Sequence, residues 1–217
     1  MNILTSLSLN RINDQLRALK SWSQYSVFSF NSKKDIETLK YVFKDVTFIE
    51  TDKIGSEFGK DYIQVSAFID WIRGNGDALI INSDIEIYGK LKFKDNALTI
   101  FSRNDYDNNL SNATLFKSGF DAFFVTKEFA HKIPETKLVM GQCHWDYFLP
   151  IIAIRKGIEL FSPRLSPLYH KRHNIQYNRE KWLQSGKIFS DELNLSGNTT
   201  NDSNHCYAQI KNNISYG

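Results

Sequence analysis

The first 87 residues alternate between short apolar runs and stretches in which apolar residues recur every three or four positions. The short runs have the length and composition of strands, and they cover residues 3–9, 26–30, 46–50 and 78–82. Between them lie three stretches with helical spacing, at residues 11–22, 32–43 and 62–72. The order β-α-β-α-β-α-β with short connections predicts a parallel sheet with right-handed crossovers.

Two of these predicted helices have a recognisable feature: the first has an apolar face, and the second has an N-terminal capping pattern. The first has an apolar face with steps of four, three and three residues, formed by Ile12, Leu16, Leu19 and Trp22. The second follows Ser32, with Asp35 three residues later, which is a capping-box spacing with Asp in the acidic position. The strand over 78–82 is apolar throughout, which predicts burial on both faces.

The second half of the chain is less regular. Strands are predicted at residues 97–102, 122–126 and 158–161, and helices at 129–133 and 145–156. Pro150 lies inside the last of these, which predicts a kink or a late helix start.

From about residue 185 the chain becomes polar and rich in Asn, Ser, Thr and Gly. Such a composition predicts a poorly packed tail or a mobile lid. The expected organisation is therefore one domain over residues 1–183, followed by a polar C-terminal tail or lid over residues 184–217.

Composition excludes several classes of protein. The 217 residues, with 41% hydrophobic and 24% charged, suffice for one domain with a full core. The mean hydropathy of −0.39 and the lack of a long apolar run exclude a spanning helix, so no membrane span is expected. A net charge of +3 gives no basic footprint for nucleic acid. Two cysteines far apart in the sequence favour the reducing cytoplasm.

Candidate chemistry follows the most buried strand. Parallel sheets bind ligands at the carboxyl ends of their strands, and Asp84 and Glu86 come just after residues 78–82. Two such carboxylates suit a hard cation such as Mg²⁺ or Mn²⁺. Asp105-Tyr106-Asp107 has the same spacing but does not follow a core strand in a βα series. The alternative is that Asp84 and Glu86 cap a turn and face solvent.

Four segments carry a resemblance to a known family: ALIINSDIEI (78–87), GFDAFF (119–124), GQCHWDYFLP (141–150) and PLYHKRH (167–173). Together they resemble the D-x-D region, here a D-x-E variant, and the W-D-Y-x-L-P and histidine segments of small GT-A-like glycosyltransferases. The resemblance covers residues 1–183. It implies an α/β fold, a GT-A-like single domain with a Rossmann-like, mostly parallel central sheet flanked by helices and a less regular C-terminal half.

The resemblance also implies an activity. A sugar would pass from a nucleotide diphosphate sugar, with a UDP-sugar favoured, to the hydroxyl of a glycan or other acceptor. Mn²⁺ or Mg²⁺ would neutralise the charge on the leaving diphosphate. Asp84, Glu86 and His170 would hold this metal, with His173 as the second choice of histidine. The alternative for either histidine is a surface or structural imidazole.

Asp146 would be the catalytic base that takes the acceptor proton in an inverting reaction. In a retaining reaction it would orient the acceptor or donor instead. The alternative is a carboxylate stabilised by the N-terminus of its helix, with Trp145 in the core. If the chain is such a glycosyltransferase, Arg103, Asp121 and Trp145 would contact the sugar. For Arg103 and Asp121, the alternative is a salt bridge at the end of a strand.

Nucleotide contacts are expected just past the first strands. The candidates are Ser6 and Leu7 for the base, Arg11 for phosphate, Asn31 for uracil or ribose, Lys60 for the diphosphate, and Ser83 beside the acidic pair. Each is equally an ordinary surface residue when taken alone.

Two other functions remain open from the sequence. A sugar-phosphate nucleotidyltransferase shares the fold class, but it would need a glycine-rich first loop, and residues 7–11 contain no glycine. A non-catalytic nucleotide-sugar or glycan-binding module is the second alternative, because D-x-E replaces D-x-D.

Overall fold

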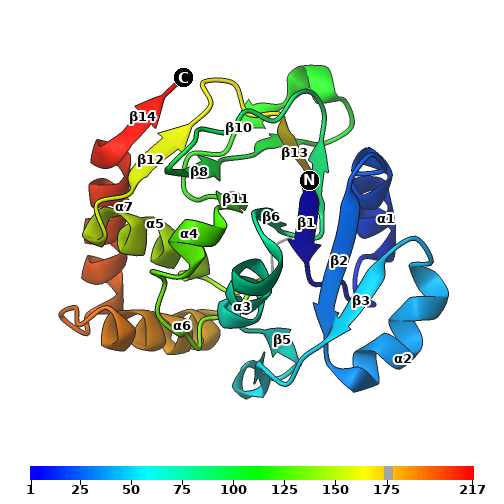
Figure 1. The fold of residues 1–217 in the computed structure, drawn as a ribbon, viewed down its shortest axis with the longest axis horizontal. Helices are drawn as coiled ribbons and strands as arrows, with labels where there is room; N and C mark the ends of the chain where they lie inside the picture. Colours follow the sequence, from blue (N-terminus) through cyan, green and yellow to red (C-terminus); the bar gives the residue numbers. More distant parts are fainter. Residues whose placement is uncertain (174–177) are drawn as a thin grey trace.

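The computed structural model describes residues 1–173 and 178–217. Its centre is an eight-stranded sheet (Figure 1). In spatial order the strands are β14 (Ile214–Tyr216), β12 (Glu159–Ser162), β8 (Ala97–Phe101), β11 (Ala122–Val125), β6 (Ala78–Ile81), β1 (Asn2–Thr5), β2 (Ser26–Asn31) and β3 (Thr47–Glu50). Neighbours are parallel except that β11 runs antiparallel to both β6 and β8. The expected α/β fold with a mostly parallel central sheet is confirmed.

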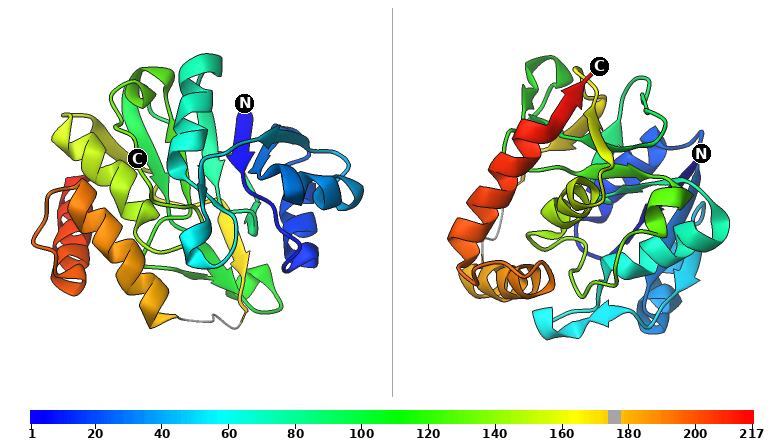
Figure 2. Two further views of the ribbon diagram at one scale, coloured as in Figure 1. Left: turned by 90° about the horizontal axis from the view of Figure 1, so that it is seen from below. Right: turned by 60° about the vertical axis from the view of Figure 1, so that its left-hand side comes forward.

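Helices cover both faces of this sheet (Figures 1 and 2). They are α1 (Ile12–Ser21), α2 (Lys33–Val42), α3 (Val65–Asn75), α4 (Lys127–Ala130), α5 (Trp145–Arg155), α6 (Arg179–Glu192) and α7 (Thr199–Asn213). The predicted start of α2 is confirmed, because the Ser32 side chain accepts a hydrogen bond from the backbone N–H of Asp35. Helix α5 begins at Trp145 and carries Pro150 in its interior.

Strand β6 explains why both faces need cover. Its side chains point alternately to the two faces, so Ala78 and Ile80 join one hydrophobic cluster with α3 to α7. Leu79 and Ile81 join another, which contains Ala18 and Trp22 from the α1 side. All four β6 residues are fully buried, as predicted from the apolar run.

A second, four-stranded sheet lies on the α1 side and was not predicted. Its order is β10 (Thr114–Leu115), β9 (Asn104–Tyr106), β13 (Leu168–Lys171) and β7 (Ile85–Ile87). These strands are two to four residues long and contain polar residues, so they lack a local strand pattern. The remaining short elements are the hairpin β4 (Ile54–Gly55) and β5 (Tyr62–Ile63) and the 3-10 turns η1 (Ser56–Phe58) and η2 (Leu110–Asn112).

The expectation of a poorly packed C-terminal tail is wrong. Helices α6 and α7 pack on the core through Phe189, Cys206 and Ile210, and β14 extends the main sheet beside β12. The expected boundary between residues 183 and 184 falls inside α6. Within the described ranges, no helix is long and apolar enough to cross a bilayer.

Candidate functional site

The two sheets bring Asp84 and His170 together. Asp84 lies in the turn between β6, at the centre of the main sheet, and β7, in the small sheet. Strand β13 pairs antiparallel with β7 so that His170 lies opposite Ile85, the residue after Asp84. His173 follows two residues after the end of β13. The site therefore depends on a pairing between segments far apart in the sequence.

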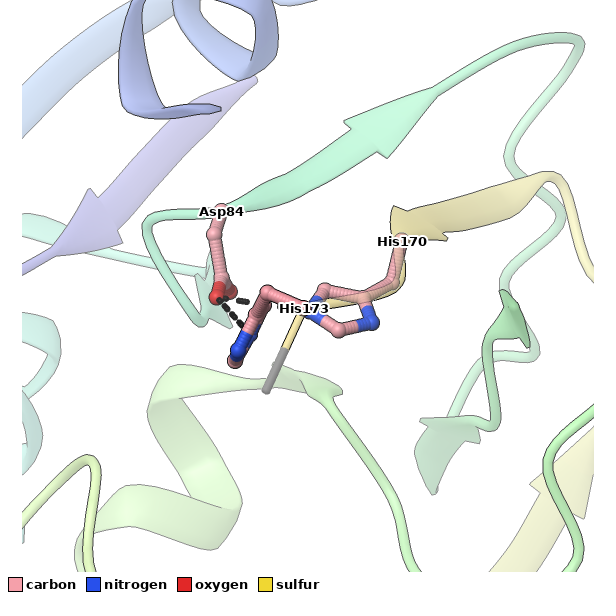
Figure 3. A group of neighbouring side chains, drawn as sticks. All are labelled: Asp84, His170 and His173. Atoms are coloured by element: carbon pink, nitrogen blue, oxygen red, sulfur yellow. Dashed lines mark ion pairs between the residues drawn. The ribbon is translucent and has the colours of Figure 1, made fainter. Parts of the chain in front are cut away.

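Asp84, His170 and His173 form a group that can hold a metal ion (Figure 3). Asp84 Oδ2 lies 3.6 Å from His170 Nε2 and 3.8 Å from His173 Nε2. The three potential ligand atoms all lie within 4.8 Å of one another. One carboxylate oxygen and two imidazole nitrogens are a donor set that suits transition-metal ions.

The surrounding charges keep Asp84 ionised. Burial disfavours the carboxylate, but hydrogen bonds from His170 and His173, with the charge of Arg11, hold the pKa of Asp84 well below its usual range. The pKa of His170 is raised, because its interaction with Asp84 outweighs the effect of burial. A carboxylate that is ionised at neutral pH can bind a cation without first losing a proton.

His170 is oriented by a second carboxylate. Its Nδ1 lies 3.0 Å from Asp105 Oδ1, which leaves Nε2 directed at Asp84. This carboxylate–histidine arrangement is the one that fixes the orientation of metal-binding histidines in many proteins.

Arg11 reaches into the same group. Its Nη2 lies 3.0 Å from Asp84 Oδ2, and its Nη1 contacts His173 Nε2. Its Nε donates to Asp14 Oδ2 at 2.8 Å. The backbone of Arg11 is left-handed, with φ 55° and ψ 43°, where it caps α1. The expected contact of Arg11 with phosphate stays a prediction.

Glu86 does not join the metal group, in contrast to the expectation from the D-x-E pattern. Its side chain is buried and accepts hydrogen bonds from the phenols of Tyr88, at 2.6 Å, and Tyr106, at 2.5 Å. Arg17 Nε lies 3.7 Å from Glu86 Oε1, the oxygen to which Tyr106 donates. The bond to Glu86 raises the pKa of Tyr88 to about 12. Glu86 therefore ties β7 to β9 instead of facing the cation.

Asp121 and Asp146 form a second acidic pair beside the metal group. Asp121 Oδ1 accepts hydrogen bonds from Arg103 Nη1 at 2.7 Å and from Asn82 Nδ2 at 3.1 Å. Its Oδ2 is buried without a hydrogen-bond partner among the described residues. Asp146 Oδ2 accepts a bond from the backbone N–H of Phe120 at 3.3 Å. Burial, and then the negative charge of Asp121, raise the pKa of Asp146 to about 7.

Arg103 connects the acidic pair to the metal group. Its Nε donates to Asp105 Oδ1 at 2.7 Å, the oxygen that also orients His170. Its guanidinium carbon lies 4.1 Å from the centre of the Phe116 ring. A continuous polar network thus runs from Asp121 through Arg103 and Asp105 to His170. We name it the site network.

The residues that were expected to bind the nucleotide base bond to one another and stabilise the loop after β1. Asn31 Nδ2 donates to the carbonyl of Leu7 at 2.8 Å, and Ser29 Oγ donates to Asn31 Oδ1 at 2.6 Å. The N–H of Leu7 donates to Ser29 Oγ at 3.0 Å, and its side chain is buried with Leu39 and Phe43. Ser6 and Ser83 are half-buried at the ends of β1 and β6.

Two further predicted residues have different surroundings. The Lys60 ammonium lies 4.2 Å above the ring of Tyr62, with Lys181 5.8 Å from the same ring. Burial and the charge of Lys181 lower the pKa of Lys60. Trp145 is 3% exposed and packs on Phe123 in the core, so it does not present an aromatic face to a sugar.

Two residues, Asp105 and His144, received no role from the sequence, and a third, His173, was only the second choice of histidine ligand. Asp105 belongs to the D-x-D match that was set aside because it does not follow a strand of the βα series, yet β9, just after the buried β8, places it beside His170. His173 was kept as an alternative to His170, and both lie in the group. His144, next to Asp146, is buried between Ser185 and Ser203, at 3.4 and 2.9 Å, and no local pattern indicated that role.

No family model matches this sequence, and no curated protein matches it. Three solved structures show similarity at 10% identity. The glycosyltransferase GlyE of Streptococcus pneumoniae TIGR4, in its apo form, has a TM-score of 0.43 over 96% of this chain. The chain spans only 63% of that protein's length.

The PaToxG glycosyltransferase has a TM-score of 0.40 over 99% of this chain and 87% of its own. The inositol-1-phosphate CTP transferase from T. maritima has a TM-score of 0.40 over 99% of this chain and 97% of its own. Similarities of this size do not assign the chain to a family.

Proposed function

We propose that this protein is a metal-dependent glycosyltransferase, which moves a sugar from a nucleotide diphosphate sugar to an acceptor hydroxyl. The observation that carries the proposal is the site network. It connects a three-ligand group for a cation to Asp121, at the carboxyl edge of a mostly parallel sheet. Next to Asp121 lies Asp146, whose pKa is raised to about 7 by burial and by the charge of Asp121.

The donor set fits the metal that the proposal requires. Two imidazoles beside one carboxylate favour a transition-metal ion, so Mn²⁺ fits better than Mg²⁺, which prefers oxygen ligands. When bound, the ion would neutralise negative charge on the leaving diphosphate. Arg11 supplies further positive charge beside the metal group. Lys60 and Lys181, which both lie over the ring of Tyr62, are further candidates for a contact with the diphosphate.

Asp146 is the proposed general base. A base works best when its pKa is near the working pH, and burial next to Asp121 brings the pKa of Asp146 there. In this role Asp146 takes the proton of the acceptor hydroxyl as that oxygen attacks the sugar. Asp121, held by Arg103, would supply the neighbouring negative charge that keeps the pKa of Asp146 raised.

Thermal unfolding with and without Mn²⁺ tests the proposal. We expect a nucleoside diphosphate, among UDP, GDP, CDP and ADP, to raise the unfolding temperature of the full chain far more when Mn²⁺ is present. Asp84→Asn should remove this metal effect, because it removes the charged ligand. Asp52→Asn, at an exposed carboxylate after β3, is the matched control and should retain it.

Three outcomes would contradict the proposal in different ways. The absence of metal-linked stabilisation by every nucleotide would exclude a metal-dependent transferase. Release of pyrophosphate from a nucleoside triphosphate and a sugar phosphate would identify a nucleotidyltransferase. Binding of a nucleotide sugar without slow hydrolysis of any donor, or transfer to any acceptor tested, would identify a binding module.

A further inference from the structure

Arg11 occupies the position in which a cation would bind. Its two terminal nitrogens approach Asp84 Oδ2, at 3.0 Å, and His173 Nε2. Both atoms belong to the metal group. A metal ion lies about 2.0–2.2 Å from oxygen and nitrogen ligands, so it needs the space into which these N–H groups point. The guanidinium and the ion therefore cannot bind this pair of atoms together.

We propose that Arg11 is an exchangeable substitute for the metal: it holds the ligand atoms in the metal-free protein, and the ion must displace it. The nucleotide part of this inference rests on the proposed function. The competition between Arg11 and the metal does not rest on it, because it follows from the ligand atoms alone.

Electrostatics explains why such a substitute is useful. Asp84, Asp105 and Asp121 gather in a small volume, and Arg103 pairs with only the last two. Without a further cation, the Asp84 carboxylate would depend on its histidines for compensation. The guanidinium of Arg11 supplies a positive charge and two directed donors, so the ligand atoms stay together before a metal arrives.

The local structure allows Arg11 to leave without being lost from the site. Its carbonyl accepts the N–H of Asp14 at 3.0 Å, which fixes the backbone at the start of α1. Its Nε is bonded to the Asp14 carboxylate, which is not a member of the metal group. The side chain is 35% exposed, so the guanidinium has room to turn towards solvent. A displaced Arg11 would remain paired with Asp14 at the edge of the site.

A displaced Arg11 would then lie beside the phosphates of a metal-bound nucleoside diphosphate. Guanidinium groups form strong paired hydrogen bonds with phosphate oxygens. The nucleotide would thus replace the contact that Arg11 loses when the metal binds. It follows that metal and nucleotide each raise the affinity for the other, because coupling between two ligands is reciprocal.

Titration of Mn²⁺ alone tests the first step, with free Mn²⁺ measured by electron paramagnetic resonance. Arg11→Ala should bind Mn²⁺ about tenfold more tightly than the wild-type chain, since the contacts of Arg11 with Asp84 and His173 no longer compete with the ion. Arg11→Lys should give an intermediate affinity, because it keeps the charge without the paired donors. Lys20→Ala, which removes an exposed charge from the same helix, is the matched control and should leave the affinity unchanged.

The same titration with UDP tests the second step. UDP should raise the Mn²⁺ affinity of the wild-type chain strongly and that of Arg11→Ala by a smaller factor. Equal or weaker Mn²⁺ binding by Arg11→Ala and Arg11→Lys would overturn the inference and leave the proposed function intact. Failure of both wild type and variants to bind Mn²⁺ would overturn the metal centre itself, and with it both proposals.

Discussion

At the scale of single residues, the site depends on where each carboxylate finds its partner. Asp84 and Glu86 are two residues apart in one turn and strand, yet one faces two histidines and the other faces two phenols. The sequence shows two acidic residues and predicts that both lie close to the edge of the sheet. It does not contain the pairing of β7 with β13 and β9, which decides what each side chain meets.

Glu86→Gln tests the structural role of Glu86. The amide can accept from one phenol but offers N–H groups to the other, so we expect a loss of about 1–2 kcal/mol in the free energy of unfolding. The Mn²⁺ affinity should not change, because the side chain is bonded outside the metal group. Urea unfolding and Mn²⁺ titration measure the two effects. A large loss of Mn²⁺ affinity in the stable variant would show that Glu86 is a ligand after all.

Asp146→Asn tests the general base. We expect transfer to fall by about a hundredfold or more, and wild-type transfer to fall as the pH drops below about 7, where Asp146 becomes protonated. Nucleotide binding should remain. Asp191→Asn, an exposed residue of α6, is the matched control for activity. Full activity of Asp146→Asn would remove this residue from the mechanism.

The same substitution, Asp146→Asn, should lower activity but should not lower the free energy of unfolding at high pH. The pKa of Asp146 in the folded state lies above its unfolded value, so the folded state binds more protons between about pH 4 and pH 7. Its contribution to stability is present at low pH and is lost as the pH rises through 7. At pH 8 the neutral amide should therefore make the variant at least as stable as the wild type in urea.

At the scale of secondary-structure elements, the C-terminal helices show where prediction from the sequence fails. Strands such as β6 and helices such as α1 have large apolar residues at regular spacing, so they were predicted. Helix α6 buries Ser185, Gly186 and Ser190 as well as Phe189, because it packs closely against its neighbours. Small polar residues at a helix contact have the composition of a loop, and only the tertiary packing distinguishes the two.

Gly186 is a direct test of this close packing. A Cβ atom at this position would lie 1.9 Å from Thr199 Cγ2, at the start of α7. Gly186→Ala should therefore lower the free energy of unfolding by about 1–3 kcal/mol, as overpacking does elsewhere. Gly74→Ala, in α3, meets nothing within 4 Å and should be neutral or stabilising. Thermal unfolding of the two variants provides the comparison, and equal midpoints would contradict the packing of α6 on α7.

His144 joins three helices: its backbone forms the N-cap of α5, and its ring contacts Ser185 of α6 and Ser203 of α7. Burial lowers the pKa of His144 to about 4. The unfolded chain therefore binds the extra proton between about pH 4 and 6.5, and stability is lost as the pH falls through that range.

The expected loss from His144 is about 3 kcal/mol at most. His144→Asn keeps a side chain that tolerates the left-handed backbone at φ 74° and does not titrate. Urea unfolding at pH 7 and pH 5 should show a smaller loss of stability in this variant than in the wild type. An equal loss in both proteins would place the acid sensitivity elsewhere.

At the scale of the whole molecule, the large and the small sheet each position part of the candidate site. The main sheet places the ends of β1, β2 and β6 along one edge, and this arrangement was predicted from the alternating pattern of the first 87 residues. The small sheet carries His170 and Asp105 to that edge, and it was not predicted, because its strands are short and pair across long sequence separations. Asp84, and His170 through the family resemblance, were therefore assigned to the metal group from the sequence, whereas the geometry of the group was not predicted.

The antiparallel pairing of β13 with β7 also sets an order of events when the chain is made. Synthesis runs from the N-terminus, so Asp84 and Arg11 emerge from the ribosome long before His170 and His173. A nascent chain that has completed β6 can already pair its carboxylate with the guanidinium, but it has no imidazole for an ion. Under the proposed function, acquisition of the metal would therefore be a late step of maturation, and a tightly held ion would mark a chain whose two sheets have joined.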